Sequence, residues 1–466
     1  MHHYGISLVC LLLLAMTAVA RPATGSGASL LAPRNNGAAA SPLSVSLVRN
    51  HAYARNGPAE YEWARAKYAQ FAPGGAAGKV PASSIEALNQ SYDREYLSPV
   101  YLGTPGQLCY LDLDTGSSDL WLFSSRTPAI FLEGQRVYSP ERSSTALAVS
   151  NASWSASYGD GSYAGGSVYR DTVRLGELVL PNVTVEAATY VSRSLAADVA
   201  MSGILGLAFH LNSTPVPHQP TLLDTLVPRL GPNTLFAVDL KHAAPGAYHF
   251  GYVNASSYTG DITWRPLQPN ATFWQFDLQA VHIGGDNASG GRGSDGGDDD
   301  GGDDDGGDDD GGNGGDGGDG GDDDDDGDGD GGDNNKPNAP IWRLHDWPMV
   351  ADTGTTLLLL PADLAELYWS FVPGAVLSET DGGWVFPCNA TLPDFSFGFA
   401  DGWNASVPGR YLNFQNLTAA NTRCYGGIQA TIAPFGILGD AFLKALYVIF
   451  DVGNARLGLA TKTLTT

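Results

Sequence analysis

Hydrophobic residues along most of the chain fall into short runs rich in Val, Leu, Tyr and Thr, and Gly, Pro and Asn separate these runs. Runs of this kind are typical of antiparallel strands joined by turns. Apolar residues recur at helical spacing in residues 60–71, which include Tyr61, Ala64 and Tyr68, and again in residues 363–371. The pattern therefore predicts an all-β fold in the main, with few long helices.

A five-residue motif occurs twice, and each copy lies between two apolar runs. Asp-Thr-Gly-Ser-Ser begins at Asp114, and Asp-Thr-Gly-Thr-Thr begins at Asp352. An Ile-Leu-Gly sequence follows each copy, with its Gly 92 residues after Asp114 and 87 residues after Asp352. A single Asp-Thr-Gly occurs in many chains by chance, but two in matching frames predict a duplicated fold with two β-rich lobes.

The paired motifs also indicate a chemistry. Gly lets the two turns approach closely, and the small hydroxyl residues can hydrogen-bond across the gap, so Asp114 and Asp352 are expected to be neighbours. Two adjacent carboxyl groups do not both ionise easily, because each negative charge disfavours the other. One keeps a proton and serves as an acid, while the other activates a water molecule. This arrangement predicts amide hydrolysis that needs no cofactor, metal or covalent intermediate.

The 466 residues carry 25 Lys and Arg against 50 Asp and Glu, which gives a formal net charge of -25. Residues 295–333 hold 20 Asp, 18 Gly and one Asn, a composition that cannot build a hydrophobic core. We expect residues 286–340 to form a disordered acidic insertion. Because clustered Lys and Arg are missing, nucleic acid is not expected as a partner.

A calcium site within the insertion is the alternative interpretation of this segment. Asp322, Asp324, Asp326 and Gly327 match the start of an EF-hand loop, and Asp333 lies near its end. A segment made of Asp and Gly matches such patterns through composition alone, and no helical pattern flanks it. A solvated loop is favoured, and no metal is expected.

The first part of the chain indicates export and processing. Residues 1–20 combine an apolar stretch too short to span a membrane with small residues at Ala18 and Ala20, which is typical of a signal peptide. Residues 21–79 carry seven basic and two acidic groups, whereas the rest of the chain is acidic. We expect residues 21–85 to be a basic prosegment that docks on the acidic body. The expected product is a secreted monomer without a membrane anchor.

Sequons and cysteines fit a secretory route. The Asn-x-Ser/Thr sequons begin at Asn89, Asn151, Asn182, Asn212, Asn254, Asn270, Asn287, Asn389, Asn404 and Asn416. The three cysteines after the signal peptide allow one disulfide and one free thiol. Pairing Cys388 with Cys424 would stabilise the fold by roughly 3 to 4 kcal/mol through loop closure. Cys109 lies in an apolar strand pattern and is expected to be buried and inert.

Seven motifs occur in order along the chain: YLGTPGQ, LDLDTGSSDLW, WSASYGDGS, ILGLAF, ADTGTTLLLLP, FGILGDAFL and VIFD. With these motifs, from about Tyr96 to Ala460, the chain resembles the pepsin-like aspartic proteases and, among them, the secreted fungal penicillopepsin and aspergillopepsin branch. A proton shared by two aspartates is the established behaviour of that class. The resemblance implies a bilobal fold with an N-terminal lobe at 86–262, a C-terminal lobe at 263–466 and the active-site cleft between them.

The resemblance also implies roles for single residues. Asp114 and Asp352 correspond to the catalytic dyad. Supporting positions in the two turns are Thr115, Gly116, Ser117, Thr353, Gly354 and Thr355, with Ser117 and Thr355 expected to orient the carboxylates. A flap that closes over substrate corresponds to Tyr158, Gly159 and Asp160, with Trp121 supporting Tyr158. The inhibitory pair of the prosegment corresponds to Lys67 and Tyr68, with Lys67 between the carboxylates.

The implied activity is that of an acid-active endopeptidase made as a self-inhibited zymogen. Large hydrophobic residues are expected at the cleaved bond, with Lys also accepted if Asp160 pairs with it. A catalytically silent peptide-binding or inhibitor-binding homologue is the alternative. A phosphoaspartyl phosphatase or ATPase is disfavoured because no parallel βαβ pattern is present. Ser202 replaces an Asp found in many relatives, and little effect on catalysis is expected.

Overall fold

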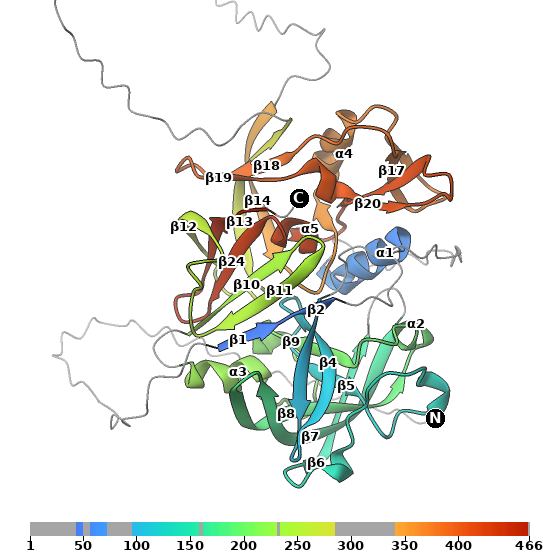
Figure 1. The fold of residues 1–466 in the computed structure, drawn as a ribbon, viewed down its shortest axis with the longest axis vertical. Helices are drawn as coiled ribbons and strands as arrows, with labels where there is room; N and C mark the ends of the chain where they lie inside the picture. The colour runs from blue at the N-terminus through green and yellow to red at the C-terminus, as the bar shows by residue number, and fades with distance from the viewer. Residues whose placement is uncertain are drawn as a thin grey trace, which may run out of the picture. The chain divides into compact units, whose positions relative to one another are not determined.

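The computed structural model describes residues 43–49, 56–71, 96–157, 162–230, 234–284 and 341–464. The expected signal peptide, the acidic insertion and the calcium pattern within it lie outside these ranges. Most described elements are strands, which confirms the predicted fold class (Figure 1). The helices of the described ranges are α1 (Gly57–Lys67), α2 (Arg193–Ala196), α3 (Leu222–Leu226), α4 (Ala362–Ser370), α5 (Asp440–Leu443), η1 (Ala69–Phe71), η2 (Ala129–Phe131), η3 (Pro140–Arg142), η4 (His210–Asn212), η5 (Val227–Arg229) and η6 (Gly409–Leu412).

The described strands form four sheets. One follows the order β2 (Val48–Arg49), β3 (Tyr96–Leu102), β4 (Gln107–Asp114), β9 (Gly203–Gly206), β5 (Leu120–Phe123), β8 (Leu178–Val191), β7 (Tyr163–Leu175) and β6 (Leu147–Ser157). The second follows the order β19 (Asn404–Val407), β18 (Phe395–Gly398), β13 (Gln275–Ile283), β14 (Ile341–Ala351), β23 (Gly436–Leu438), β15 (Leu358–Leu360) and β22 (Ile428–Ala430). The third follows the order β1 (Leu43–Ser46), β11 (Ala244–Phe250), β10 (Leu235–Lys241), β24 (Leu446–Asp451), β25 (Arg456–Thr461) and β12 (Thr259–Pro266). The fourth follows the order β16 (Val376–Ser378), β17 (Gly383–Pro387), β21 (Arg423–Gly426) and β20 (Asn413–Asn416).

The two Asp-Thr-Gly turns come at the ends of equivalent strands. β4 ends at Asp114 and pairs in parallel with β9, which pairs antiparallel with β5. β14 ends at Ala351 and pairs in parallel with β23, which pairs antiparallel with β15. A Cβ on Gly206, at the end of β9, would lie 2.5 Å from the carbonyl carbon of Ser118, so only Gly lets β9 approach the first turn this closely. The repeated strand pattern confirms the duplicated, β-rich lobes.

A six-stranded sheet contains strands from both halves of the sequence. β10, β11 and β12 precede the acidic insertion, and β24 and β25 follow it. β1, from the expected prosegment, pairs antiparallel with β11, with Val45 opposite Tyr248. The lobe boundary expected at residues 262 and 263 therefore falls within β12 of this shared sheet.

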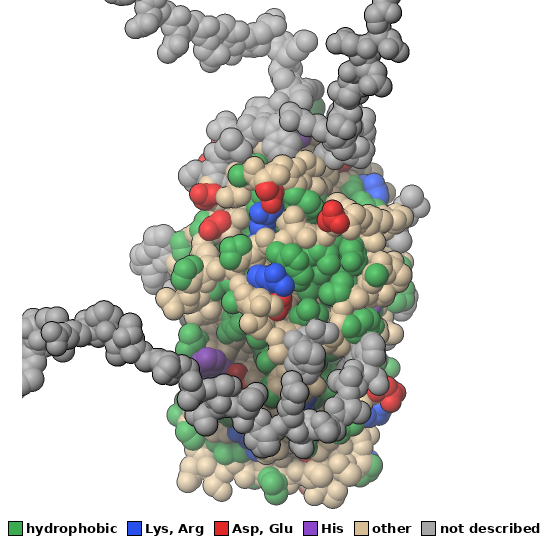
Figure 2. Space-filling view, turned by 90° about the vertical axis from the view of Figure 1, so that its left-hand side faces the viewer, with side chains coloured by type: hydrophobic (Ala, Val, Ile, Leu, Met, Phe, Trp, Pro, Cys, Tyr) green, Lys and Arg blue, Asp and Glu red, His purple; other side chains and the backbone are tan. Residues whose placement is uncertain are grey.

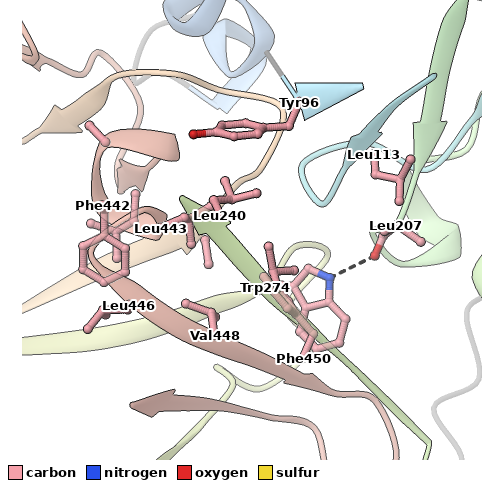
Figure 3. Packing of buried hydrophobic residues seen from close by; sticks show 14 of the residues in the cluster. Tyr96, Leu113, Leu207, Leu240, Trp274, Phe442, Leu443, Leu446, Val448 and Phe450 are labelled. Carbon is pink, nitrogen blue, oxygen red and sulfur yellow. Dashed lines mark hydrogen bonds between the residues drawn. The ribbon is translucent and has the colours of Figure 1, made fainter. Parts of the chain in front are cut away.

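Buried aromatic residues connect this sheet to the strand that carries the first turn. The rings of Phe236 and Phe450 stack at 4.7 Å, and Trp274 meets Phe450 edge-on at 5.0 Å. The Trp274 Nε1 donates a hydrogen bond to the backbone oxygen of Leu207 over 2.9 Å (Figure 3). Leu113, which directly precedes the first motif, belongs to the same buried cluster. The Leu207 nitrogen in turn donates to the Asp114 backbone oxygen over 2.7 Å, so this core holds the end of β4.

Helix α1 covers most of the segment in which the sequence predicts a helix. The Asn56 Oδ1 accepts a hydrogen bond from the Ala59 backbone nitrogen over 3.2 Å, and a proline in the first turn favours the same start. The α-helix ends at Lys67, and the Tyr68 backbone N–H bonds the Ala66 oxygen. The short helix η1 continues to Phe71. The buried side of the segment includes Tyr61, Ala64 and Tyr68, as the helical spacing predicts.

Cys388 and Cys424 form the expected disulfide, with an S–S distance of 2.05 Å. The Cys109 thiol is free and buried, and burial raises its pKa to about 12. No helix in the described ranges is long and apolar enough to cross a membrane. On the face shown in Figure 2, hydrophobic side chains gather near the middle, and the Lys and Arg side chains in view are scattered.

Candidate active site

The turns after β4 and β14 bring the two motif aspartates together. Asp114 is 1% exposed and Asp352 is 0% exposed. Each carboxylate is held within its own turn: the Gly116 nitrogen donates to Asp114 Oδ1 over 2.8 Å, and the Gly354 nitrogen donates to Asp352 Oδ1 over 3.0 Å. A Cβ on Gly116 would lie 2.5 Å from Asp352 Oδ1. Glycine is therefore required where the two turns meet.

Two threonines connect the turns in a nearly symmetrical way. The backbone nitrogens of Thr115 and Thr353 each donate to the Oγ1 of the other threonine over 3.0 Å. The Thr115 Oγ1 also donates to the Ala351 oxygen over 2.9 Å, and the Thr353 Oγ1 donates to the Leu113 oxygen over 2.5 Å. These buried bonds cross between the two halves and fix the relative position of the carboxylates.

The ammonium group of Lys67, at the end of α1, lies between the carboxylates. Its Nζ is 2.7 Å from Asp114 Oδ1 and 3.0 Å from both oxygens of Asp352. The next residue, Tyr68, donates its hydroxyl to Asp352 Oδ2 over 2.8 Å. The ammonium also lies 4.9 Å from the centre of the Trp63 ring, a favourable cation–π distance. The end of α1 thus places an ammonium group between the two carboxylates.

The pKa values of the two aspartates are shifted in opposite directions, that of Asp114 upward and that of Asp352 downward. Burial raises the pKa of the Asp114 carboxyl, and the neighbouring Asp352 adds to this rise, so it lies above its usual value although Lys67 opposes the shift. Burial also raises the pKa of Asp352, but the charge of Lys67 and hydrogen bonds from Asp114 and Thr355 outweigh burial and hold it below its usual value. Burial lowers the pKa of Lys67, but both aspartates overcome this effect and raise it. Asp352 therefore keeps its negative charge to a lower pH than Asp114 does in this state.

Hydrogen bonds along α1 fix the helix to the C-terminal half (Figure 1). The Gly57 nitrogen donates to the Gln415 side-chain oxygen over 2.6 Å. The Tyr61 hydroxyl donates to the Ala430 backbone oxygen over 2.6 Å. These contacts place the last turn of α1, and with it Lys67, at the dyad.

Two aromatic side chains of the same segment lie between a pair of phenylalanines. Tyr68 contacts Phe273 and Phe435 edge-on at 5.4 Å each. Phe71 contacts the same two rings at 5.4 and 5.6 Å. Edge-on aromatic contacts add to the apolar burial, so this pair of rings is a second anchor for the segment.

A cavity of about 220 Å³ remains beside α1. Residues of both halves line it: Asp112, Ser194, Leu195, Asp198, Met201 and Ile204 from the first, and Thr353, Gly354, Thr355, Thr356 and Asp440 from the second, with Ala59, Glu60 and Trp63 from α1. Burial, and then the charge of Asp114, raise the pKa of Asp112 well above its usual range. The cavity thus offers apolar surface and carboxyl groups next to the dyad.

Not every expected contact of the turns is formed. The Thr355 Oγ1 donates to Asp352 Oδ2 over 2.5 Å, which matches its predicted position. Within the described residues the Ser117 hydroxyl makes no such bond to Asp114, whose Oδ1 accepts from the Gly116 nitrogen and from Lys67. Trp121 is buried and stacks on Trp154 at 5.9 Å. Tyr158, Gly159 and Asp160 lie outside the described residues, so the flap stays a prediction.

Four residues of the site were not predicted from the sequence. Asp112 had a usable signal, because alternate residues of a strand face the same side and it lies two before Asp114. Trp63 had a weaker signal, since it lies one helical turn before Lys67 on α1. Phe273 and Phe435 had none, because 162 residues separate them and only the fold brings their rings together.

Comparison with known proteins agrees with this geometry. Residues 95–301 and 337–462 match the family model described as eukaryotic aspartyl protease. The chain belongs to this family. It is therefore an aspartic-type endopeptidase, a hydrolase that acts on protein and peptide substrates.

Fungal members of the family are similar over most of their length. Endothiapepsin of Cryphonectria parasitica is 35% identical over 433 residues, which cover 90% of both chains. Aspergillopepsin-1 of Emericella nidulans is 36% identical over 87% of this chain and 88% of its own. Podosporapepsin of Podospora anserina is 34% identical over 84% of this chain and 78% of its own. An aspartic proteinase structure from Irpex lacteus shares the fold, with a TM-score of 0.56, 22% identity, and coverage of 80% of this chain and 95% of its own.

Proposed function

We propose that Asp114 and Asp352 cleave internal peptide bonds at acidic pH and that this chain is a latent zymogen. The observation that carries the proposal is the Lys67 ammonium, 2.7 Å from Asp114 and 3.0 Å from Asp352. A cation there neutralises the dyad and fills the space that a water molecule and a peptide carbonyl need. Residues 43–71 then act as the inhibitory part of a prosegment spanning residues 21–85.

The proposed reaction begins after Lys67 leaves. Asp352, which Thr355 helps to keep charged, removes a proton from a water molecule as its oxygen attacks the carbonyl carbon. Protonated Asp114 donates its proton to the carbonyl oxygen. When the C–N bond breaks, the leaving nitrogen takes the proton that Asp352 gained from water. A hydroxyl group of the tetrahedral intermediate returns its proton to Asp114 as the product carboxyl group forms, so the dyad again holds one shared proton.

Acidification is the proposed trigger for release. Because Lys67 holds the pKa of Asp352 below its usual value, the ion pair persists near neutral pH and weakens as pH falls through that lowered pKa. Processing between about Lys79 and Tyr92 then removes the prosegment. Export through a signal peptide at residues 1–20 and a monomeric product complete the proposal.

The proposed substrate preference is for large hydrophobic residues at the cleaved bond. The Phe273 and Phe435 rings that hold Tyr68 and Phe71 support it. Acceptance of Lys is attributed to Asp160, which lies outside the described residues.

The decisive experiment measures cleavage of a denatured protein at pH 3 to 5 after acid activation, with and without a statine-type inhibitor. We expect Asp114→Asn and Asp352→Asn each to reduce the rate by about 10³-fold or more. Asp277→Asn, which changes an exposed carboxyl group on β13, is the matched control and should keep full activity. Inhibitor binding without any turnover would favour the silent homologue instead. Proteolysis that survives both Asn substitutions would reject the dyad.

A further inference from the structure

The sequons of the chain divide into two groups in the folded structure. Asn89 and Asn287 lie outside the described residues, and the other eight sequons begin within them. Four of these eight asparagines are exposed, namely Asn151, Asn182, Asn270 and Asn389. The other four are half-buried, namely Asn212, Asn254, Asn404 and Asn416. The contacts of the side chains follow the same division.

Two of the exposed asparagines lie at irregularities of the strand pairing. Asn151 lies where the register of β6 against β7 shifts, between Ala148 and Ser153, and its φ is 57°. Asn182 lies where the register of β8 against β7 shifts, and its φ is 60°. A bulge leaves its extra residue outside the hydrogen-bonded ladder, and Asn adopts a positive φ more readily than most residues. Both asparagines are therefore presented to solvent.

The other two exposed asparagines lie in surface connections. Asn270 lies between β12 and β13, and its φ is 59°. Asn389 follows β17, in a turn closed by a hydrogen bond of 2.8 Å from the Ala390 nitrogen to the Pro387 oxygen. Among the described residues, none forms a hydrogen bond with the side-chain amide of any of the four exposed asparagines. These amides are available for modification.

Two half-buried asparagines already use the nitrogen to which a sugar would be attached. The Asn212 Nδ2 donates to the Thr272 backbone oxygen over 2.6 Å and so ties η4 to the connection between β12 and β13. The Asn254 Nδ2 donates to the Ser257 Oγ over 3.1 Å. These side chains have a structural role.

The remaining two half-buried asparagines lie on paired strands. Asn404, on β19, is opposite Gly398 of β18, and its Nδ2 donates to the Gly402 backbone oxygen over 3.4 Å. Asn416, on β20, is opposite Cys424 of β21, and its Oδ1 lies 2.9 Å from the Cys424 sulfur. A sugar at either position would press against the neighbouring strand.

We propose that N-linked oligosaccharides are attached at Asn151, Asn182, Asn270 and Asn389 and that the four half-buried sequons of the secreted chain stay unmodified. This inference rests on the proposed export of the chain. The donor is a lipid diphosphate oligosaccharide, and a transferase of the export route is the catalyst. The Nδ2 loses a proton and bonds to C1 of the first N-acetylglucosamine, while the bond from C1 to the diphosphate oxygen breaks and the lipid diphosphate leaves.

The folded state selects among the sites because a sugar attached during export is present while the chain folds. At an exposed asparagine the sugar stays in water. At Asn212 it would disturb a bond to a partly buried carbonyl group, and an unsatisfied buried group costs about 1 to 3 kcal/mol. A chain recovered from the medium has folded, so its modified sites are those that the fold tolerates.

A preference of turns for Asn does not by itself explain the exposed group. Four asparagines of the described ranges have a positive φ, and three of them begin a sequon. The fourth, Asn421, is exposed and has a φ of 52°, but Arg423 follows where a sequon needs Ser or Thr. Positive φ accounts for Asn but not for the hydroxyl residue two positions later.

The test is mass spectrometry of the full-length chain secreted by a fungal host. The chain is treated with an endoglycosidase that leaves one N-acetylglucosamine at each modified site and is then digested to peptides. We expect this sugar on most molecules at Asn151, Asn182, Asn270 and Asn389. The peptides that contain the four half-buried sequons should be unmodified.

Single Asn→Asp variants at the four exposed positions keep the shape of the side chain and remove the acceptor nitrogen. Each should increase electrophoretic mobility by one step before deglycosylation and should match the wild type afterwards. Asn421→Asp is the matched control and should leave the mobility unchanged. None of the four exposed asparagines lines the cavity beside the dyad, so cleavage of a denatured protein should continue in every variant.

Comparable occupancy of the exposed and half-buried groups would overturn the proposal, because exposure in the fold would then not select the sites. A chain that is secreted without glycans would also overturn it, while confirming the proposed export. Loss of proteolysis in a chain with the expected glycans would contradict the proposed activity alone.

Discussion

At the scale of single residues, Lys67 has the largest predicted effect on activation. Its ion pair with Asp352 contributes stability above the usual carboxyl pKa, and this contribution is lost as pH falls through the lowered pKa of Asp352. We expect Lys67→Met to release the prosegment at a higher pH than the wild type, measured as the midpoint of processing between pH 3 and 7. Arg65→Met, on the same helix, is the matched control and should process like the wild type. Full latency of Lys67→Met near neutral pH would contradict the proposed clamp.

Glu186 is expected to make the folding stability of the chain depend on pH. This residue lies opposite Trp121 in the sheet, is 2% exposed, and its Oε2 has no hydrogen-bond partner among the described residues. Burial, and then the charge of Asp119, raise its pKa well above the usual value. The native state therefore keeps a proton that the unfolded chain releases, so stability falls as pH rises from about 4.3 towards the native pKa.

Replacing Glu186 with Gln keeps the shape and removes the titration. We expect the Tm of the wild type to fall between pH 4 and 7 and the Tm of Glu186→Gln to fall less. The upper limit of the difference is about 1.4 kcal/mol per pH unit. Exposed Glu133→Gln serves as the control, measured by thermal unfolding in the same buffers. Parallel pH profiles for wild type and Glu186→Gln would show that this carboxyl group is ionised in the folded state.

At the scale of elements, the acidic insertion lies between the two strands of an antiparallel hairpin. β13 and β14 pair antiparallel, and Ile283 lies directly opposite Ile341. A two-residue turn can join strands in this register, so the residues between them are not needed to close the hairpin. The fold therefore tolerates the insertion because it begins and ends at adjacent points of one sheet.

A deletion tests this interpretation of the hairpin. Replacing residues 284–340 with Asn-Gly should leave proteolysis unchanged and should raise stability by up to about 3 kcal/mol, because closing a long loop costs entropy. Thermal unfolding and cleavage of a denatured protein are the two measurements. A chain that no longer folds or cleaves would show that the insertion contributes contacts of its own.

At the scale of the whole molecule, the relative position of the two halves depends on the hydrogen bonds that Thr115 and Thr353 form between the turns. Thr353→Val leaves the Leu113 carbonyl and the Thr115 amide without a partner in a buried site. We expect a loss of roughly 2 to 4 kcal/mol in unfolding free energy and a lower rate constant for cleavage, since the carboxylates lose their fixed separation. Thr263→Val on β12 is the control, compared by urea unfolding. A variant that unfolds like the wild type would show that these bonds contribute little.

The sequence by itself determined the strands, the duplication and the identity of the two aspartates. Strand patterns depend on alternating local hydrophobicity, and the repeated Asp-Thr-Gly turn needs only short-range backbone geometry, so both can be recognised along the chain. The helix at 60–71 was also predictable from local periodicity. The pairing of Cys388 with Cys424 was predictable from the number and positions of the cysteines. The basic leader and acidic body indicated an electrostatic contact, and the family resemblance assigned Lys67 to it.

Only the tertiary structure decided which distant side chains meet. The Phe273 and Phe435 pair and the distances from Lys67 to both carboxylates depend on packing between segments far apart in sequence. The pKa values of Asp114 and Asp352 move in opposite directions for the same reason, because burial and neighbouring charge are set by the assembled fold and not by the motif.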